Sequence, residues 1–206
     1  MRSRPFHESR RAVSETRTHL AVFLLVAQIF GAAADAQQAQ ESKLAPGSFK
    51  AYAAEGVEAR VSDFSGLPVP RYSSLRYDKV NGRAGPSRDY PVQWTYERQG
   101  LPVVVVRESQ DWWKIRDPMG DEVWVNKALV VARRTAISTG DGAIRRSPDT
   151  KSGIVVRYAA GAVMSLGECR AGWCSVEAEG RKGFARQDQL WGADALPGAQ
   201  DRPPAR

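Results

Sequence analysis

Histidine is almost absent from this sequence of 206 residues, and its two copies, His7 and His19, both stand near the start. Beyond residue 19 the chain therefore has no serine–histidine or cysteine–histidine nucleophile pair and no histidine-ligated zinc. A glycine-rich phosphate loop ahead of a helical pattern is also missing. Carboxylates cluster at 117–122, but this stretch is predicted to be a turn, where solvated charge is their usual role. We therefore predict a protein that is not an enzyme and that needs no cofactor or metal.

Long apolar runs are missing as well. The longest, 20–34, has 15 residues and contains Gln28, whereas a helix that spans a bilayer needs about 20. Five arginines precede this run and an Ala-x-Ala site ending at Ala36 follows it, the pattern of a secretory leader. We predict a signal peptide over 1–36 and a periplasmic or secreted protein, without a stable membrane span after cleavage. A leader that is kept as an anchor is the alternative.

The charge balance is mildly basic. The net charge of +7 falls to +5 when the leader, with five Arg and three acidic residues, is set aside. A basic chain can bind nucleic acid, but an exported one meets anionic envelope polymers and lipid head groups instead. We therefore expect no nucleic-acid partner. Lys and Arg scattered over a solvated surface are the alternative meaning of this charge.

Two stretches have the composition of flexible chain. Residues 37–70 and 193–206 are rich in Ala, Gln, Gly, Ser or Pro and show no sustained hydrophobic period, so we predict a disordered linker and a disordered tail. Between them Val, Trp, Tyr and Ile are dense, and turn dipeptides recur at short intervals. This pattern is typical of small all-β domains.

The central region repeats itself. RAGPSRDY from Arg83 returns as RRSPDTKS from Arg145, and WWKI from Trp112 returns as WCSV from Trp173, at offsets of 61 or 62. Two tandem units, 71–131 and 132–192, are therefore predicted. Each holds a long polar loop and three short strands, at 102–106, 112–116 and 122–126 in the first unit and at 162–166, 173–177 and 183–187 in the second. Such strands must close into a small barrel, with a predicted core of Val103, Val105, Ile115, Val123 and Val125 in the first unit and Met164, Leu166, Val176 and Ala185 in the second.

These motifs resemble a known family. The Arg-x-Gly-Pro-Ser loop from Arg83, the Trp-x-Lys-Ile strand from Trp112 and the Trp-Val strand from Trp124 are similar to bacterial SH3-like domains. The tandem pair resembles an exported two-copy variety of uncharacterised bacterial proteins. The resemblance implies an all-β protein with two tandem SH3-like barrels, a fold that serves many binding functions. Two residues depart from the family pattern: Gly82 replaces a branched apolar residue, and Val123 replaces the Gly that usually precedes the Trp.

The two cysteines, Cys169 and Cys174, flank a predicted hairpin turn. The repeat alignment makes them equivalent to Glu108 and Trp113, so they should face each other across two antiparallel strands. In an oxidising compartment this arrangement predicts a disulfide rather than half of a structural zinc site. Strict alternation would then put the core candidates of these two strands on opposite faces. A β-bulge is needed for both to reach the core.

The adjacent tryptophans are candidate site residues. Alternation puts Trp113 on the face of Ile115 and Trp112 on the outer face with Lys114. The stretch also resembles eukaryotic SH3 domains, whose first Trp lines the ligand groove, but the tyrosine that completes a proline-binding groove appears here as Ala128. Packing against a small barrel is the alternative role for the exposed rings. The ligand-binding residues that we predict are Tyr90, Trp94, Tyr96, Trp112 and Trp173 for aromatic contact and Arg83, Arg88 and Lys114 for positive charge.

Together these patterns predict an exported binding module of the bacterial cell envelope. An aromatic surface flanked by cations suits a ligand with an apolar or sugar face and an acidic group. Peptidoglycan or another envelope component is therefore the expected ligand. A periplasmic protein–protein adaptor or assembly factor with no wall ligand is the alternative. The pattern does not define the oligomeric state.

Overall fold

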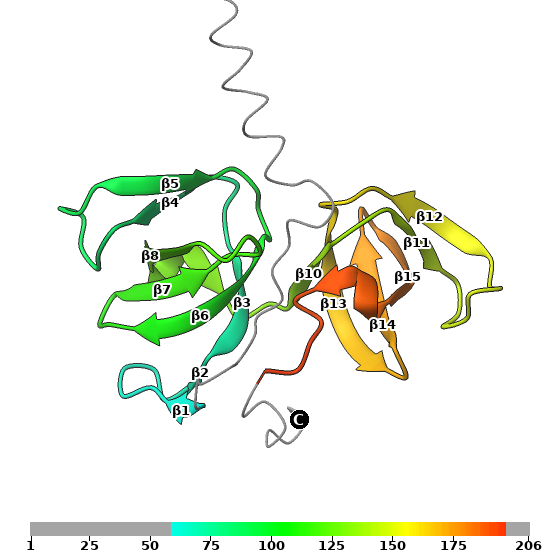
Figure 1. The fold of residues 1–206 in the computed structure, drawn as a ribbon, viewed down its shortest axis with the longest axis horizontal. Helices are drawn as coiled ribbons and strands as arrows, with labels where there is room; N and C mark the ends of the chain where they lie inside the picture. The colour runs from blue at the N-terminus through cyan, green and yellow to red at the C-terminus, as the bar shows by residue number, and fades with distance from the viewer. Residues whose placement is uncertain (1–58, 197–206) are drawn as a thin grey trace, which may run out of the picture. The chain divides into compact units, whose positions relative to one another are not determined.

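The computed structural model describes residues 59–196, which all lie in one compact unit. Two curved seven-stranded sheets dominate this part (Figure 1). The first sheet, barrel 1, consists of β3 (Arg71–Leu75), β4 (Val80–Arg83), β5 (Val92–Tyr96), β6 (Pro102–Glu108), β7 (Trp112–Arg116), β8 (Glu122–Asn126) and β9 (Val130–Val131). The second sheet, barrel 2, consists of β10 (Thr135–Ser138), β11 (Gly142–Arg145), β12 (Ile154–Tyr158), β13 (Val163–Arg170), β14 (Trp173–Ala178), β15 (Arg181–Arg186) and β16 (Leu190–Trp191).

The two sheets have the same topology. Barrel 1 follows the order β5-β4-β8-β7-β6-β3-β9 and barrel 2 follows the order β12-β11-β15-β14-β13-β10-β16. In each barrel a short 3₁₀ turn, η2 (Lys127–Leu129) or η3 (Gln187–Gln189), precedes the last strand. The predicted all-β fold of two tandem SH3-like barrels is confirmed. No helix within residues 59–196 is long and apolar enough to cross a bilayer.

The long polar loop predicted in each unit contains a hairpin. In barrel 1 this is the β4–β5 pair, and in barrel 2 it is the β11–β12 pair. The outer strand of each hairpin lies at the edge of its sheet. Val92 and Ile154 begin these edge strands and are exposed. Both strands nevertheless carry a strand-like pattern, because β5 (VQWTY) alternates and β12 (IVVRY) begins with an apolar run.

The prediction of a flexible linker over 37–70 is wrong for its last part. Residues 60–69 form a hairpin in which β1 (Arg60–Val61) pairs with β2 (Pro68–Val69). Val69 is buried, and the Ser62 hydroxyl donates a hydrogen bond to the buried carboxylate of Glu108, 46 residues away. Contact with barrel 1 therefore orders a segment whose composition is that of a linker. The rest of the predicted linker and the predicted signal peptide, 1–36, lie outside the described residues.

The predicted disordered tail, 193–206, also needs correction at its start. Ala193 and Leu196 are each only 5% exposed and belong to the hydrophobic cores. Burial of apolar side chains fixes these residues in place. Residues 197–206 lie outside the described part of the chain.

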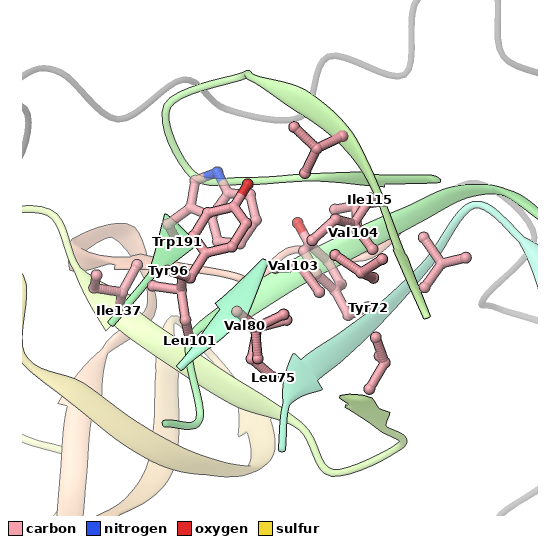
Figure 2. Close-up of a cluster of buried hydrophobic side chains, with 14 of the residues drawn as sticks. Tyr72, Leu75, Val80, Tyr96, Leu101, Val103, Val104, Ile115, Ile137 and Trp191 are labelled. Carbon is pink, nitrogen blue, oxygen red and sulfur yellow. The ribbon is translucent and has the colours of Figure 1, made fainter. Parts of the chain in front are cut away.

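The cores contain the residues that alternation selected. All five predicted core residues of barrel 1 are at most 4% exposed, and Met164, Val176 and Ala185 of barrel 2 are equally buried. Leu166 is partly buried and packs against the same core. The larger cluster also includes Ile137 and Trp191, which come from the second repeat (Figure 2).

The bulge predicted in barrel 2 is present. On the β13–β14 pair, Leu166 lies opposite Val176 and Cys169 lies opposite Cys174, with a register shift between the two pairs. The shift adds one residue to β13, so both Leu166 and Val176 face the core. Barrel 1 has its own shift at the equivalent place, between Val105 and Arg107 on β6.

Candidate ligand-binding face

Alternation on two neighbouring strands builds the outer face of barrel 1. Trp112 and Lys114 lie two residues apart on β7, and Lys114 pairs directly with Trp124 of β8, so their side chains point to the same side. All three are half-buried. Trp113 points the other way, pairs with Val125 and packs against the core. We call Trp112, Lys114 and Trp124 the aromatic face of barrel 1.

The loop between β4 and β5 is held beside this face by Arg83. Arg83 pairs with Trp124 across the β4–β8 ladder. Its guanidinium Nη1 donates hydrogen bonds to the carbonyl oxygens of Arg88, at 3.0 Å, and Tyr90, at 2.7 Å. The Tyr90 ring covers Gly85, where an added β-carbon would lie 2.6 Å from the ring. Arg83 therefore organises the loop, while the side chain of Arg88 is exposed.

Ion pairs cover part of the aromatic face of barrel 1. The carboxylate of Glu122 on β8 forms ion pairs with Lys114 Nζ, at 2.6 Å, and with Arg116 Nη2, at 2.5 Å. Burial raises the pKa of Glu122, but the hydrogen bonds and charges of Lys114 and Arg116 outweigh it and hold that pKa below its usual range. The positive charge of Lys114, predicted to contact a ligand, is thus paired within the barrel.

Two of the predicted aromatic site residues do not line this face. Trp94 is partly buried and packs against the core, with its ring centroid 6.5 Å from that of Tyr96. Tyr96 is itself a core residue, 5% exposed, and its hydroxyl donates to Asp117 Oδ2 at 3.2 Å. Burial, together with the neighbouring charge of Asp117, raises the pKa of Tyr96. Tyr96 is therefore a neutral hydrogen-bond donor inside the barrel.

Barrel 2 repeats the face with different neighbours. Ser175 of β14 pairs with Phe184 of β15, and Trp173 lies two residues before Ser175 on the same side. Phe184 also pairs with Arg145. Arg145 Nη1 donates a hydrogen bond to the carbonyl oxygen of Ser152 at 2.7 Å. Arg145 thus holds the loop of barrel 2 as Arg83 holds the loop of barrel 1. Trp173, Phe184 and Arg145 thus occupy the places of Trp112, Trp124 and Arg83.

Barrel 2 is hollowed along this face. Pro148, Glu168, Arg170, Ala171, Trp173, Ser175 and Phe184 line a cavity of about 420 Å³. A second cavity, of about 510 Å³, shares Ser175 and Phe184 and is also lined by Ser165, Leu166, Gly167, Val176, Glu177, Lys182 and Gly183. Because they share two lining residues, the cavities adjoin. We call them together the barrel 2 groove.

The hairpin tip beside the groove is cross-linked. Cys169 and Cys174 form the predicted disulfide. In barrel 1 the equivalent pair is Glu108 and Trp113, and an ionic cluster takes the place of the covalent bond. Arg71 forms an ion pair with Glu108 and stacks over the Trp113 ring, 4.5 Å from its centroid.

Glu108 is ionised in this cluster. Burial raises the pKa of Glu108, but hydrogen bonds from Ser62, Ser65 and Arg71 and the Arg71 charge outweigh it. The pKa therefore lies below its usual range. A buried carboxylate with these partners joins the N-terminal hairpin to barrel 1.

Comparison with known families identifies this repeat. The family model described as the bacterial SH3 domain matches residues 76–131 and again 139–192. The chain belongs to the bacterial SH3 domain family. The two matches coincide with barrel 1 and barrel 2, so each barrel is one bacterial SH3 domain.

Comparisons with whole proteins add no second family. No curated protein matches the chain significantly. Among solved structures, NlpC2 of Trichomonas vaginalis matches with 13% identity and a TM-score of 0.28, over 59% of this chain and 48% of the other. NlpC1 of the same organism matches with 14% identity and a TM-score of 0.27, over 64% of this chain and 48% of the other. The chain thus spans about half the length of each of these two structures.

Repeat equivalence locates two site residues that alternation in barrel 1 had not suggested. Phe184 follows from aligning GFA of the second SH3 domain with VWV of the first, and Pro148 follows from its place three residues after Arg145. Within residues 59–196, no group of three or more His, Cys, Asp or Glu side chains is arranged to hold a metal ion. The side chains of the face provide aromatic contact, hydrogen bonding and charge.

Proposed function

We propose that this protein is an exported, non-enzymatic binding module of the bacterial cell envelope that recognises peptidoglycan or another envelope component. Membership of the bacterial SH3 family supports a binding role in general terms. The basic leader with its Ala-x-Ala site supports export. The Cys169–Cys174 disulfide supports an oxidising compartment, where such bonds form and persist.

One observation carries the proposal of a ligand-binding face. Trp112 and Trp124 of barrel 1 recur as Trp173 and Phe184 in barrel 2, in the same cross-strand register and on the outer face. Solvent-facing aromatic rings that recur beside a charged loop offer a stacking surface for sugar rings or apolar groups. The cations near them favour a ligand that also carries acidic groups.

Co-sedimentation tests this function. The mature chain, 37–206, is mixed with purified peptidoglycan, and the fraction in the pellet is measured over a range of wall concentrations. We expect saturable sedimentation, which the double substitution Trp112→Ala with Trp173→Ala reduces at least tenfold. Tyr77→Ala is the matched control, because Tyr77 is also an exposed aromatic, 48% exposed, and lies in the connection before β4.

Two outcomes contradict the proposal. If the wild-type chain stays in the supernatant while crosslinking in envelope extract traps a soluble protein, the chain is an adaptor. If Tyr77→Ala removes as much binding as the double variant, the aromatic face is not the site. Circular dichroism of each variant shows whether the loss of binding follows loss of fold.

Export has its own test. N-terminal sequencing of the protein isolated from its native host is expected to begin at Gln37. A stable species that begins at Met1 and fractionates with the cytosol contradicts export, whatever the ligand.

A further inference from the structure

Small residues form the floor of the barrel 2 groove. Gly167 is the residue that the β13 bulge adds, and a β-carbon there would overlap Ser175 Oγ. Ser175 is the central outward residue of β14 and lines both cavities. Trp173 lies two residues before it on β14, and Phe184 lies opposite it on β15. A hollow therefore lies where two strands carry no large side chain.

Larger side chains hold the same positions in barrel 1. The strand register makes Val106 equivalent to Gly167 and Lys114 equivalent to Ser175. Lys114 crosses toward β8 to reach Glu122, and Arg116 reaches the same carboxylate. The side chains of Lys114, Arg116 and Glu122 are only 25–33% exposed, so they lie along the surface.

The equivalent charges of barrel 2 project into solvent. Glu177 and Lys182 hold the places of Arg116 and Glu122, with the signs exchanged. Their side chains are 44% and 79% exposed, and their ionic atoms are 3.6 Å apart. Such an exposed pair contributes little to stability and separates readily. The end of the groove beside this pair is therefore accessible to a charged ligand.

We propose that barrel 2 carries the ligand groove of this protein and that the Lys114–Glu122–Arg116 ion pairs close the equivalent face of barrel 1. The groove is open in barrel 2 because Gly167 and Ser175 are small, whereas Val106 and Lys114 hold the same positions in barrel 1. This inference rests on the proposed binding function and assigns it to one of two SH3 domains that share a fold. Barrel 1 then serves as the scaffold to which the N-terminal hairpin attaches.

The charges of the groove select its ligand class. Glu168 and Arg170 stand at the hairpin end, 3.3 Å apart, and Glu177 and Lys182 stand at the other end, so each end offers one acid and one base in an exposed, loosely held pair. A polyanion would meet a carboxylate at both ends. The stretch of β14 from Trp173 to Glu177 spans roughly 13 Å at about 3.3 Å per residue. We assign to the groove a short extended peptide of about four residues that bears both a free amine and a free carboxylate.

Substitutions that exchange Ser175 of barrel 2 and the equivalent Lys114 of barrel 1 test the assignment. Ser175→Lys gives barrel 2 the side chain of barrel 1, and Lys114→Ser does the reverse. The mature chain and its variants are titrated with soluble peptides released from purified peptidoglycan by an amidase and, separately, with the glycan strands. We expect one peptide site per chain, at least tenfold weaker binding in Ser175→Lys, and tighter or additional binding in Lys114→Ser. Gln93→Lys, on the exposed edge strand β5, controls for the added charge.

A measurement without ligand tests the groove separately. The tryptophans are labelled with 5-fluorotryptophan, and ¹⁹F resonances are assigned with Trp112→Phe and Trp173→Phe. A soluble paramagnetic probe is expected to broaden the Trp173 signal more than the Trp112 signal, and Lys114→Ser is expected to reduce this difference. Equal broadening of the two signals in the wild-type chain overturns the closed face of barrel 1.

The failures can be told apart. If the wild type binds neither intact peptidoglycan nor its fragments, the proposed function fails and the ligand assignment fails with it. If the wild type binds but Ser175→Lys binds equally well, or two equal peptide sites are found, the function stands and the barrel 2 assignment fails. Binding of glycan strands but not of peptides refutes the ligand class.

Discussion

Gly82 of β4 lies directly against Val123 of β8: a β-carbon added to Gly82 would lie 2.8 Å from Val123 Cβ. Barrel 2 has the reverse arrangement, because a β-carbon added to Gly183 would lie 2.6 Å from Ile144 Cγ2. The strand register makes Gly82 equivalent to Ile144 and Val123 equivalent to Gly183. Each barrel thus holds one glycine and one branched residue at this contact, on opposite strands. The two departures of barrel 1 from the family pattern compensate each other.

The swap predicts strong coupling between the two positions. Gly82→Ile alone should destabilise the protein by roughly 1–3 kcal/mol, because the side chain has no room beside Val123. Val123→Gly alone should also destabilise it, by leaving a cavity. The double variant restores the arrangement of barrel 2 and should recover most of the loss. Thermal and urea unfolding of the four proteins gives the coupling free energy.

The reciprocal variants in barrel 2 serve as the control for this cycle. Gly183→Val should destabilise the protein because it meets Ile144 and the backbone of Arg145. Adding Ile144→Gly should recover part of the stability. Additive free energies in both barrels would show that the two positions do not constrain each other.

The buried Glu108 makes attachment of the N-terminal hairpin dependent on pH. Its pKa is held below the usual range, so the stability it contributes is complete above the unfolded-state pKa and is lost as the pH falls through the lower folded-state value. We expect the amide of Ser62, which donates to the Leu67 carbonyl, to lose protection from hydrogen exchange in that acid range. Hydrogen exchange followed by NMR from neutral to acid pH measures this loss.

Glu108→Gln is the reference for this measurement, because the amide does not titrate. Glu122 and Asp188 also have lowered pKa values, so only the difference between wild type and Glu108→Gln reports on Glu108. The same acid dependence in both proteins would show that Glu108 does not control the hairpin.

The disulfide stabilises the tip of one hairpin and does not determine the fold. Because it closes a short loop, with a sequence separation of 5, replacing both cysteines by Ser should cost about 2 kcal/mol. The barrel should persist, since Cys174 is one member of the core and the others, such as Ile144 and Met164, are unchanged. Unfolding in urea, with and without a dithiol reductant, measures the effect. If the reductant destabilises the double-Ser variant as much as the wild type, its effect does not come from breaking the Cys169–Cys174 disulfide.

The sequence was sufficient to predict the central strands because their side chains alternate and the pattern occurs twice. Val103, Val105 and Ile115 could be assigned to the core from this period alone. The hairpin at 60–69 could not be predicted, because Ser62 depends on Glu108, a partner far away in the chain. The edge strand β5 was missed because turn residues precede it and the whole stretch was assigned to a loop, although VQWTY alternates.

The candidate site was predictable only in part. Alternation placed Trp112 and Lys114 on the outer face, but it could not show that Glu122 pairs with Lys114. Tyr96 was assigned to the ligand because aromatic residues precede it, whereas its strand turns it inward to Asp117. The hollow in barrel 2 depends on which positions are small on neighbouring strands, and this becomes visible only when the register is known.

The adjacent tryptophans should separate in their effect on stability. Trp113 packs against the core and lies beneath the Arg71 guanidinium, so Trp113→Ala removes buried contacts and should cost roughly 3–5 kcal/mol. Trp112 lies on the outer face, so Trp112→Ala should cost about 1 kcal/mol. Thermal melts of the two variants, with and without Arg71→Lys, separate the stability due to packing of the Trp113 ring from that due to the Arg71 guanidinium stacked on it. Arg71→Lys should further destabilise the Trp112 variant but have a smaller effect on the Trp113 variant, where the ring is already missing. Equal losses in the two tryptophan variants would show that Trp112 is as much a part of the core as Trp113, and that the aromatic face of barrel 1 is a packing surface.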